Sequence, residues 1–123
     1  MHGNLIIVIS NLARATQYYT HVFDFECTDQ SPDHALIKRG KLSIKLIQEK
    51  NSTALLGMHM ASPLSQNMFS PFMISIQTDN IENMYQKALS SGGRPITPIT
   101  EKFNVKTARI IGIENHTWQL IQK

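Results

Sequence analysis

Apolar and polar positions follow two different periods along the chain. Residues 4–9 form a short run rich in β-branched side chains, which is typical of a buried strand. From residue 12 the apolar positions recur at spacings of three and four, which predicts a helix, and Ser10-Asn11 offers its N-terminal cap. Three short strands are expected next, at about 25–29, 34–38 and 42–48.

The second half of the chain repeats this order of patterns. Residues 72–77 have the pattern of a strand, and Asp79 with Glu82 offers a capping pair for a second helix. That helix has its own apolar stripe and is expected to stop at the Ser-Gly-Gly of residues 91–93. Further strands are expected at about 94–97, 105–112 and 116–122. Each half therefore predicts the order β-α-β-β-β.

One short phrase occurs in both halves. Residues 43–48 and 117–122 both end in Leu-Ile-Gln and are separated by 117 − 43 = 74 positions. The expected helix starts, Asn11 and Asn80, are separated by 80 − 11 = 69 positions, so the second copy is 74 − 69 = 5 residues longer. We therefore expect one α+β domain, residues 1–123, built from two copies of one unit. The copies span about 1–48 and 72–123.

The segment between the copies, residues 49–71, is too long for a simple turn. It contains Met and Phe residues among Ser, Asn, Gln and Pro. Two interpretations stay open for it. It is either a linker that plugs a few side chains into the core, or a flap over a pocket with adaptable Met contacts.

Alternation along the strands gives the predicted sheet two faces. One face is apolar throughout, so the two amphipathic helices are expected to cover it. The other face mixes polar and aliphatic side chains, which suits a ligand cavity or a subunit contact better than open solvent. The side chains of this mixed face that we expect to contact a ligand are Asn4, Lys45, Met73, Ser75, Gln77, Arg109, Thr117 and Gln119.

Composition and charge narrow the classes of function. The chain has 41% hydrophobic and 17% charged residues, an ordinary globular mixture, and a net charge of +3. Its Lys and Arg residues are scattered, which argues against a nucleic-acid-binding face. The single cysteine, Cys27, excludes an internal disulfide and a Cys-rich metal site. With no signal-like start and no apolar run as long as a membrane span, a cytoplasmic protein without membrane contact is expected.

Two stretches carry a family resemblance. Residues 9–26 resemble the first strand and helix of the vicinal oxygen chelate superfamily, which includes glyoxalases, extradiol dioxygenases and bleomycin-resistance proteins. Residues 112–119 resemble its closing Asp-Pro-x-Gly-(Asn/His)-x-x-Glu signature. The resemblance spans nearly the whole chain. It implies two βαβββ units that form a curved mixed sheet with helices on the outer face.

The resemblance also implies where a metal would be bound. Metal-dependent members of the superfamily place four ligands, one on the first and one on the last strand of each unit. The corresponding positions here are Asn4, Lys45, Met73 and Gln119. Such a set contains no carboxylate, imidazole or thiolate, the usual ligands of a catalytic divalent ion, and an ammonium repels a cation. The histidines of the chain show no ligand spacing, so no metal or other cofactor is expected.

The leading hypothesis for function is a metal-independent protein that binds or sequesters a small molecule. The bleomycin-resistance relatives do so in grooves between two subunits, and a homodimer is therefore expected. Lys45 and Arg109 would contact an anionic or carbonyl group, while the polar neighbours supply hydrogen bonds. Met73, with Met and Phe side chains of the linker, would form an apolar wall.

Two alternatives remain. The first is a lyase, isomerase or dioxygenase-like enzyme that uses the same cavity, with a metal or with Lys45 as base or Schiff-base nucleophile. The second is an interaction module whose mixed face serves mainly dimerisation. Structural roles are open for two side chains as well: Lys45 could extend to the cavity edge, and Arg109 could form a salt bridge with Glu101 or Glu114.

Overall fold

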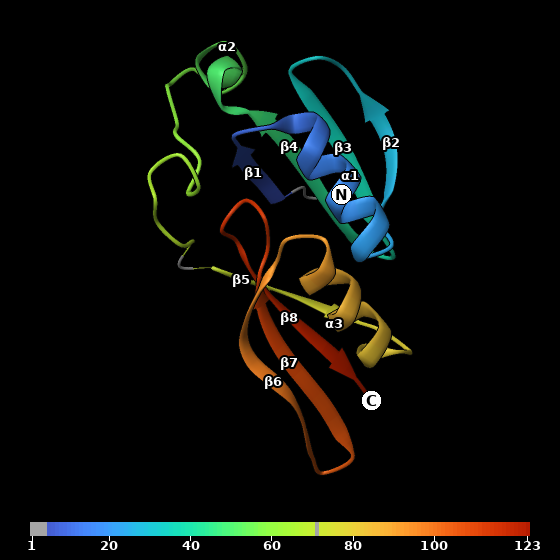
Figure 1. Cartoon of the computed structure of the whole chain (residues 1–123). Coiled ribbons are helices and arrows are strands. Elements are labelled where there is room, and N and C mark those ends of the chain that lie inside the picture. The colour runs from blue at the N-terminus through green and yellow to red at the C-terminus, as the bar shows by residue number, and fades with distance from the viewer. Residues whose placement is uncertain (1–4, 71) are drawn as a thin grey trace. The chain divides into compact units, whose positions relative to one another are not determined.

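The computed structural model describes residues 5–70 and 72–123, and the predicted contact residue Asn4 lies outside them. The chain divides into two compact units, Met1–Asn67 and Met68–Lys123. This boundary lies inside the segment that separates the two predicted copies. Each unit has its own four-stranded sheet and its own helix (Figure 1).

The first unit has the predicted β-α-β-β-β order, followed by a short helical extension. Its sheet has the order β1-β4-β3-β2, in which only the β1–β4 pair is parallel. The elements are β1 (Leu5–Ile9), α1 (Leu12–Val22), β2 (Glu26–Gln30), β3 (His34–Arg39), β4 (Leu42–Gln48), η1 (Glu49–Asn51) and α2 (Ser52–Leu56).

The second unit repeats this topology. Its sheet has the order β5-β8-β7-β6, and again only the pair of first and last strands, β5 and β8, is parallel. The elements are β5 (Met73–Gln77), α3 (Ile81–Ser90), β6 (Arg94–Lys102), β7 (Val105–Ile111) and β8 (Thr117–Gln122). The prediction of an α+β fold from two βαβββ units is therefore confirmed.

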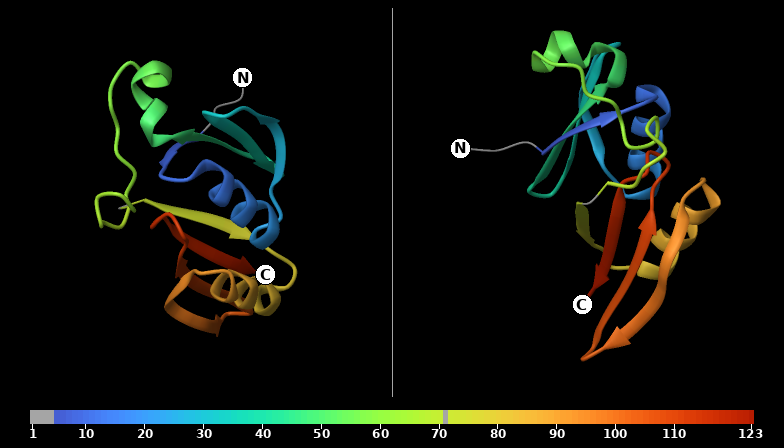
Figure 2. Two further views of the ribbon diagram at one scale, coloured as in Figure 1. Left: turned by 45° about the horizontal axis from the view of Figure 1, so that its top comes forward. Right: turned by 90° about the vertical axis from the view of Figure 1, so that its left-hand side faces the viewer.

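One helix covers one face of each sheet, as the alternation of apolar residues predicted (Figures 1 and 2). The covered face is apolar because every second strand residue points towards the helix. In the first unit the buried side chains are Ile7, Ile9, Ile37, Ile44 and Leu46 of the sheet with Leu12, Ala15, Tyr19, Val22 and Phe23 of the helical region. In the second unit they are Ile74, Ile76, Ala108, Ile110, Trp118 and Leu120 of the sheet with Ile81, Met84 and Ala88 of the helix.

The Gln that ends the repeated phrase fixes the start of the helix in each unit. Gln48 Oε1 accepts a hydrogen bond from Leu12 N at 2.8 Å, and Gln48 Nε2 donates to Ser10 O at 2.6 Å. Gln122 Oε1 accepts from Ile81 N in the same way, at 2.8 Å. The first backbone N–H groups of a helix have no partner within the helix, so these amides satisfy one of them in each copy.

Asn residues cap both helices, at the two aligned positions. Asn11 accepts from Arg14 N and Asn80 accepts from Asn83 N, each at 3.1 Å. The predicted capping pair of Asp79 and Glu82 is wrong, because Asn80 is the cap.

The Glu82 side chain instead accepts a hydrogen bond from Lys106 Nζ of β7, at 2.9 Å. This ion pair joins the first turn of α3 to the neighbouring hairpin. Both side chains are partly exposed, so we assign it a small contribution to stability.

Two longer parts explain the extra residues of the second copy: the β6–β7 hairpin, and the β7–β8 connection of residues 112–116, where β3 and β4 are joined by residues 40–41. β6 has 9 residues where β2 has 5, so the predicted end of this strand at residue 97 is wrong. Pro95 and Pro98 lie within this strand, although proline cannot donate a ladder hydrogen bond. β6 is an edge strand, however, where such a residue is tolerated. Phe103 and Asn104, both with positive φ, form the tight turn to β7.

The segment between the two predicted copies begins as a helix, which the sequence did not predict. After α2, the chain is tied back by Glu49, whose carboxylate accepts from Ser62 N at 2.6 Å and from Ser65 Oγ at 2.7 Å. Desolvation acts to raise the pKa of Glu49, but these hydrogen bonds outweigh it and hold that pKa below its ordinary value.

None of the helices in the described ranges is long and apolar enough to cross a membrane.

Candidate functional site

The face that α3 leaves open carries six of the eight predicted contact residues. The register places Gln119 of β8 between Ser75 of β5 and Arg109 of β7. Ser75 Oγ donates to Gln119 Oε1 at 3.0 Å, so these two side chains point into the same space. The structure therefore brings three predicted residues together in one polar row.

The rows on either side hold the remaining residues of this group. On one side Met73 pairs with Thr117, and Thr117 pairs with Ile111 of β7. On the other side Gln77 pairs with Ile121. Residues two apart on a strand share a face, so all of these side chains belong to the open face of the second sheet.

Arg109 stands exposed in this polar row. The salt bridge considered for it, with Glu101 or Glu114, does not form in the structure: the described residues place no carboxylate within ion-pair distance of its guanidinium. Its charge is therefore available to a ligand on this face.

Lys45 occupies the equivalent place in the first unit, with different neighbours. It pairs with Ile6 of β1 and Leu36 of β3, where the second unit has Ser75 and Arg109 around its Gln. Its side chain is half-buried and makes no ion pair with any described residue. The middle row of the open face of the first sheet thus has a lysine between two aliphatic side chains.

The residues at the superfamily's ligand positions do not fit a catalytic metal ion. Lys45 offers an ammonium, and Met73 a thioether on a residue that is 45% exposed. Gln119 offers an amide oxygen that already accepts a hydrogen bond from Ser75. Within the described ranges no three His, Cys, Asp or Glu side chains cluster as metal ligands. Such a donor set lacks the imidazole and carboxylate groups that hold zinc, iron or manganese.

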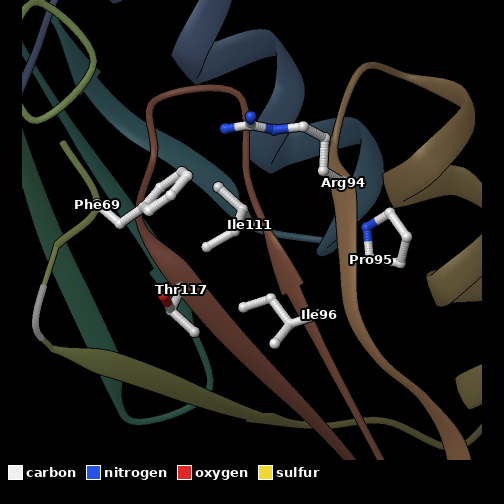
Figure 3. Close-up of a pocket in the computed structure, with 6 residues that line it drawn as sticks. All are labelled: Phe69, Arg94, Pro95, Ile96, Ile111 and Thr117. Atoms are coloured by element: carbon white, nitrogen blue, oxygen red, sulfur yellow. The ribbon is translucent and has the colours of Figure 1, made fainter. Parts of the chain in front are cut away.

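A pocket of about 510 Å³ lies at the end of the open face where β8 begins (Figure 3). The predicted residue Thr117 lines it, and Phe69 supplies the apolar wall expected from the Met- and Phe-containing segment. The other lining residues, which the sequence did not reveal, are Arg94, Pro95, Ile96 and Ile111.

Arg94 is held over this pocket by two contacts. Its side chain extends over Ile111 towards the ring of Phe69, and the guanidinium carbon lies 5.2 Å from the ring centroid (Figure 3). Its Nη2 donates to Asn115 Oδ1 at 2.9 Å. Asn115 in turn donates from Nδ2 to Met68 O at 3.0 Å, so one amide connects the arginine to the segment that carries the aromatic wall.

The closing motif, residues 112–119, contributes to the rim of the pocket through Asn115 and Thr117. Gly112 N donates to His116 O at 2.9 Å, and Asn115 takes a positive φ of 65° in the turn. A Cβ on Gly112 would lie 3.0 Å from Trp118 Nε1, so a larger residue here would have to displace the indole by a few tenths of an ångström. Burial lowers the pKa of His116 to about 4, which keeps its imidazole neutral at neutral pH.

The paired βαβββ units, each with one open sheet face, define the class of protein. The model of the Glyoxalase/Bleomycin resistance protein/Dioxygenase superfamily matches residues 3–117. The chain belongs to this superfamily, as its sequence motifs predicted. No curated protein sequence matches the chain significantly.

Solved structures share this fold at low sequence identity. A glyoxalase/bleomycin resistance protein/dioxygenase family enzyme from Burkholderia phytofirmans PsJN is 16% identical, with a TM-score of 0.77 over 97% of this chain and 95% of that one. The fosfomycin resistance protein FosX from Mesorhizobium loti is 14% identical, with a TM-score of 0.73 over 100% of this chain and 92% of that one. TioX from Micromonospora sp. ML1 is 13% identical, with a TM-score of 0.70 over 100% and 96%. At these identities the similarity concerns the fold.

Proposed function

We propose that the protein binds or sequesters a small molecule without a metal ion. The observation that carries this proposal is the polar row of Ser75, Gln119 and Arg109 on the sheet face that α3 leaves open. Gln119 lies at a metal-ligand position of the superfamily. Its amide oxygen accepts the hydrogen bond from Ser75, which leaves its amide nitrogen as a donor. An amide donor beside an exposed guanidinium suits a carbonyl or an anionic group.

Surrounding side chains support binding of an organic molecule rather than an ion alone. Met73 and Thr117 lie in the next row, beside the pocket below Arg94. Binding sites for organic ligands combine an apolar lining with a few polar groups that fix the orientation. This face has both.

A thermal-shift screen against metabolites and antibiotics, with metal analysis of the same sample, tests the proposal. We expect ligands that raise the melting temperature in the absence of added metal, since a ligand that binds only the folded state stabilises it. Gln119→Ala and Arg109→Met should reduce the shift, while Arg14→Met on the exposed side of α1 is the matched control. Stoichiometric zinc, nickel or iron in the purified protein would contradict the proposal.

The alternative proposal is an enzyme that uses the same cavity, with a metal or with Lys45. Lys45 lies between Ile6 and Leu36 on the open face and makes no ion pair with any described residue, so its amine can reach a carbonyl compound. A lysine that forms a Schiff base is trapped by borohydride in the presence of a carbonyl compound. An adduct on Lys45 that is absent in Lys45→Met would support the enzyme, and no adduct would leave the binding function as the better proposal.

We further propose a homodimer, in which the mixed open faces are buried against ligand or partner. Exposed apolar side chains on these faces, Ile6 and Met73, support an additional contact in solution. Light scattering at micromolar concentration tests this point, and a monomer would contradict it. A Gln119→Ala or Lys45→Glu variant that separates the dimer but keeps ligand binding would instead favour an interaction module.

A further inference from the structure

The positive charge of the Arg94 guanidinium is free to contact a ligand in the pocket below it. The hydrogen-bond acceptor of Arg94 is a neutral amide, Asn115 Oδ1, and no described carboxylate lies within ion-pair distance of the guanidinium. A guanidinium carries five N–H donors in a planar fork, and this contact uses one of its terminal nitrogens. The remaining edge matches a carboxylate in bidentate geometry.

The contacts of Arg94 also pre-organise it. Stacking against Phe69 and the bond to Asn115 hold a long side chain that would otherwise lose conformational freedom on binding an anion. Since Asn115 is itself fixed by Met68 O, the guanidinium is set in place before a ligand arrives.

The walls of the pocket suit an apolar body. Ile96 is 48% exposed and Phe69 56% exposed, although both are large apolar side chains. Together with Pro95 and Ile111 they form a lining whose polar members are Arg94 and Thr117. The volume of about 510 Å³ lies within the usual range for organic ligands, roughly 300–1,000 Å³. Burying the rings of a ligand against these walls would cover apolar surface that is now in water.

We propose that this pocket binds a small molecule in which a carboxylate is attached to an aromatic ring system. The carboxylate would lie on the free edge of Arg94 and the rings against Phe69, Ile96 and Ile111. This inference rests on the proposed binding function and adds the class of ligand and the residue that recognises it.

Three naphthalene probes of the same shape test the charge requirement: 1-naphthoate, 1-naphthamide and 1-naphthylmethylamine. Binding is followed by methyl NMR of Ile96, Ile111 and Thr117. We expect 1-naphthoate to shift these methyl signals and to bind about 10–100-fold more tightly than the amide, the gain of a charge-assisted hydrogen-bonded pair. The amine should bind most weakly, because its charge has the sign of Arg94.

Two substitutions at one position separate charge from packing. Arg94→Met keeps an unbranched side chain over Ile111 and should remove the preference for the acid over the amide. Arg94→Lys keeps the charge without the fork and should leave an intermediate preference. Arg14→Met, on the exposed surface of α1, should bind all three probes as the wild type does. Unchanged chemical shifts outside the pocket establish that each variant is folded.

The possible outcomes distinguish this inference from the function on which it rests. Equal binding of acid and amide, or an unchanged preference in a folded Arg94→Met, would overturn the assignment of a carboxylate. If the methyl signals stay unchanged and only the backbone amide signals of Ser75, Arg109 and Gln119 shift, this pocket is overturned while binding on the open face is supported. If no probe shifts these methyl signals, the pocket assignment fails, and the thermal-shift screen decides on the binding function separately.

Discussion

Acidification to pH 5 should destabilise the second unit through one side chain, His116. His116 is 7% exposed, and its Nδ1 has no hydrogen-bond partner among the described residues. Because burial removes water from the charged form, the pKa of His116 falls from 6.5 to about 4. Between these two values the unfolded chain binds a proton that the folded protein does not.

The sign and size of the effect follow from this difference in proton binding. A lowered pKa in the folded state contributes stability above pH 6.5 that is lost as the pH falls towards 4. The loss is RT ln[(1 + 10^(6.5−pH))/(1 + 10^(4−pH))], which amounts to about 2 kcal/mol at pH 5 and about 0.2 kcal/mol at pH 7. A change of this size is a large fraction of the free energy of unfolding of a small domain.

Carboxyl groups affect stability at lower pH. The hydrogen bond from Ser31 lowers the pKa of Asp33, and the hydrogen bond from Lys106 lowers that of Glu82. Their contributions are lost as the pH falls below the ordinary values, 3.8 and 4.5, towards the lowered ones. The window from pH 7 to pH 5 therefore reports mainly on histidine.

Urea unfolding followed by the fluorescence of Trp118 provides the assay. This residue is the only tryptophan of the chain and is fully buried in the second unit. The free energy of unfolding should fall by about 2 kcal/mol from pH 7 to pH 5 in the wild type and by less than about 0.5 kcal/mol in His116→Gln. Any loss that is common to both pH values cancels within each variant. An equal fall in both proteins would refute the reasoning.

Three structural contacts give further predictions, each measured by urea unfolding. Gln48→Ala should cost about 1–2 kcal/mol and Gln122→Ala about 1 kcal/mol, because the first side chain makes two hydrogen bonds at its helix start and the second makes one; equal costs would contradict this reading. Gly112→Ala should cost about 1–3 kcal/mol, because its Cβ would meet the buried indole of Trp118; a neutral effect would show that the indole can move. Asn115→Gly should cost less than Asn115→Ala, because glycine accepts the positive φ, yet both should weaken binding in the arginine pocket to a similar degree.

Local patterns predicted the elements well because each element is decided by near neighbours in sequence. The spacing of apolar residues in α1 and α3, and the alternation in β4 and β8, follow directly from helix and strand geometry. The errors arose where two local signals compete. Asp79 and Asn80 are both good caps, and the prolines of β6 end a central strand but not an edge strand.

The pocket could not be predicted in the same way. It joins the segment around Phe69, the start of β6 and the β7–β8 connection, which are far apart in sequence. Arg94 carries no periodic signal, and its position depends on Asn115, a residue 21 positions away. Periodicity located the open face through Thr117 and Gln119, but a contact between distant loops needs the fold itself.

The two copies differ where their shared scaffold does not constrain them. In both, a Leu-Ile-Gln ending places its Gln on the helix start, so packing and capping hold these positions constant. The open faces have no such constraint, and the middle row of one is aliphatic around a lysine while that of the other is polar. The rows are Ile6, Lys45 and Leu36 in the first unit and Ser75, Gln119 and Arg109 in the second. The first face therefore offers one ammonium among aliphatic side chains, and the second offers hydrogen-bonding groups beside a guanidinium, so each suits a different ligand chemistry. The open faces have therefore diverged on a scaffold that packing and capping keep constant.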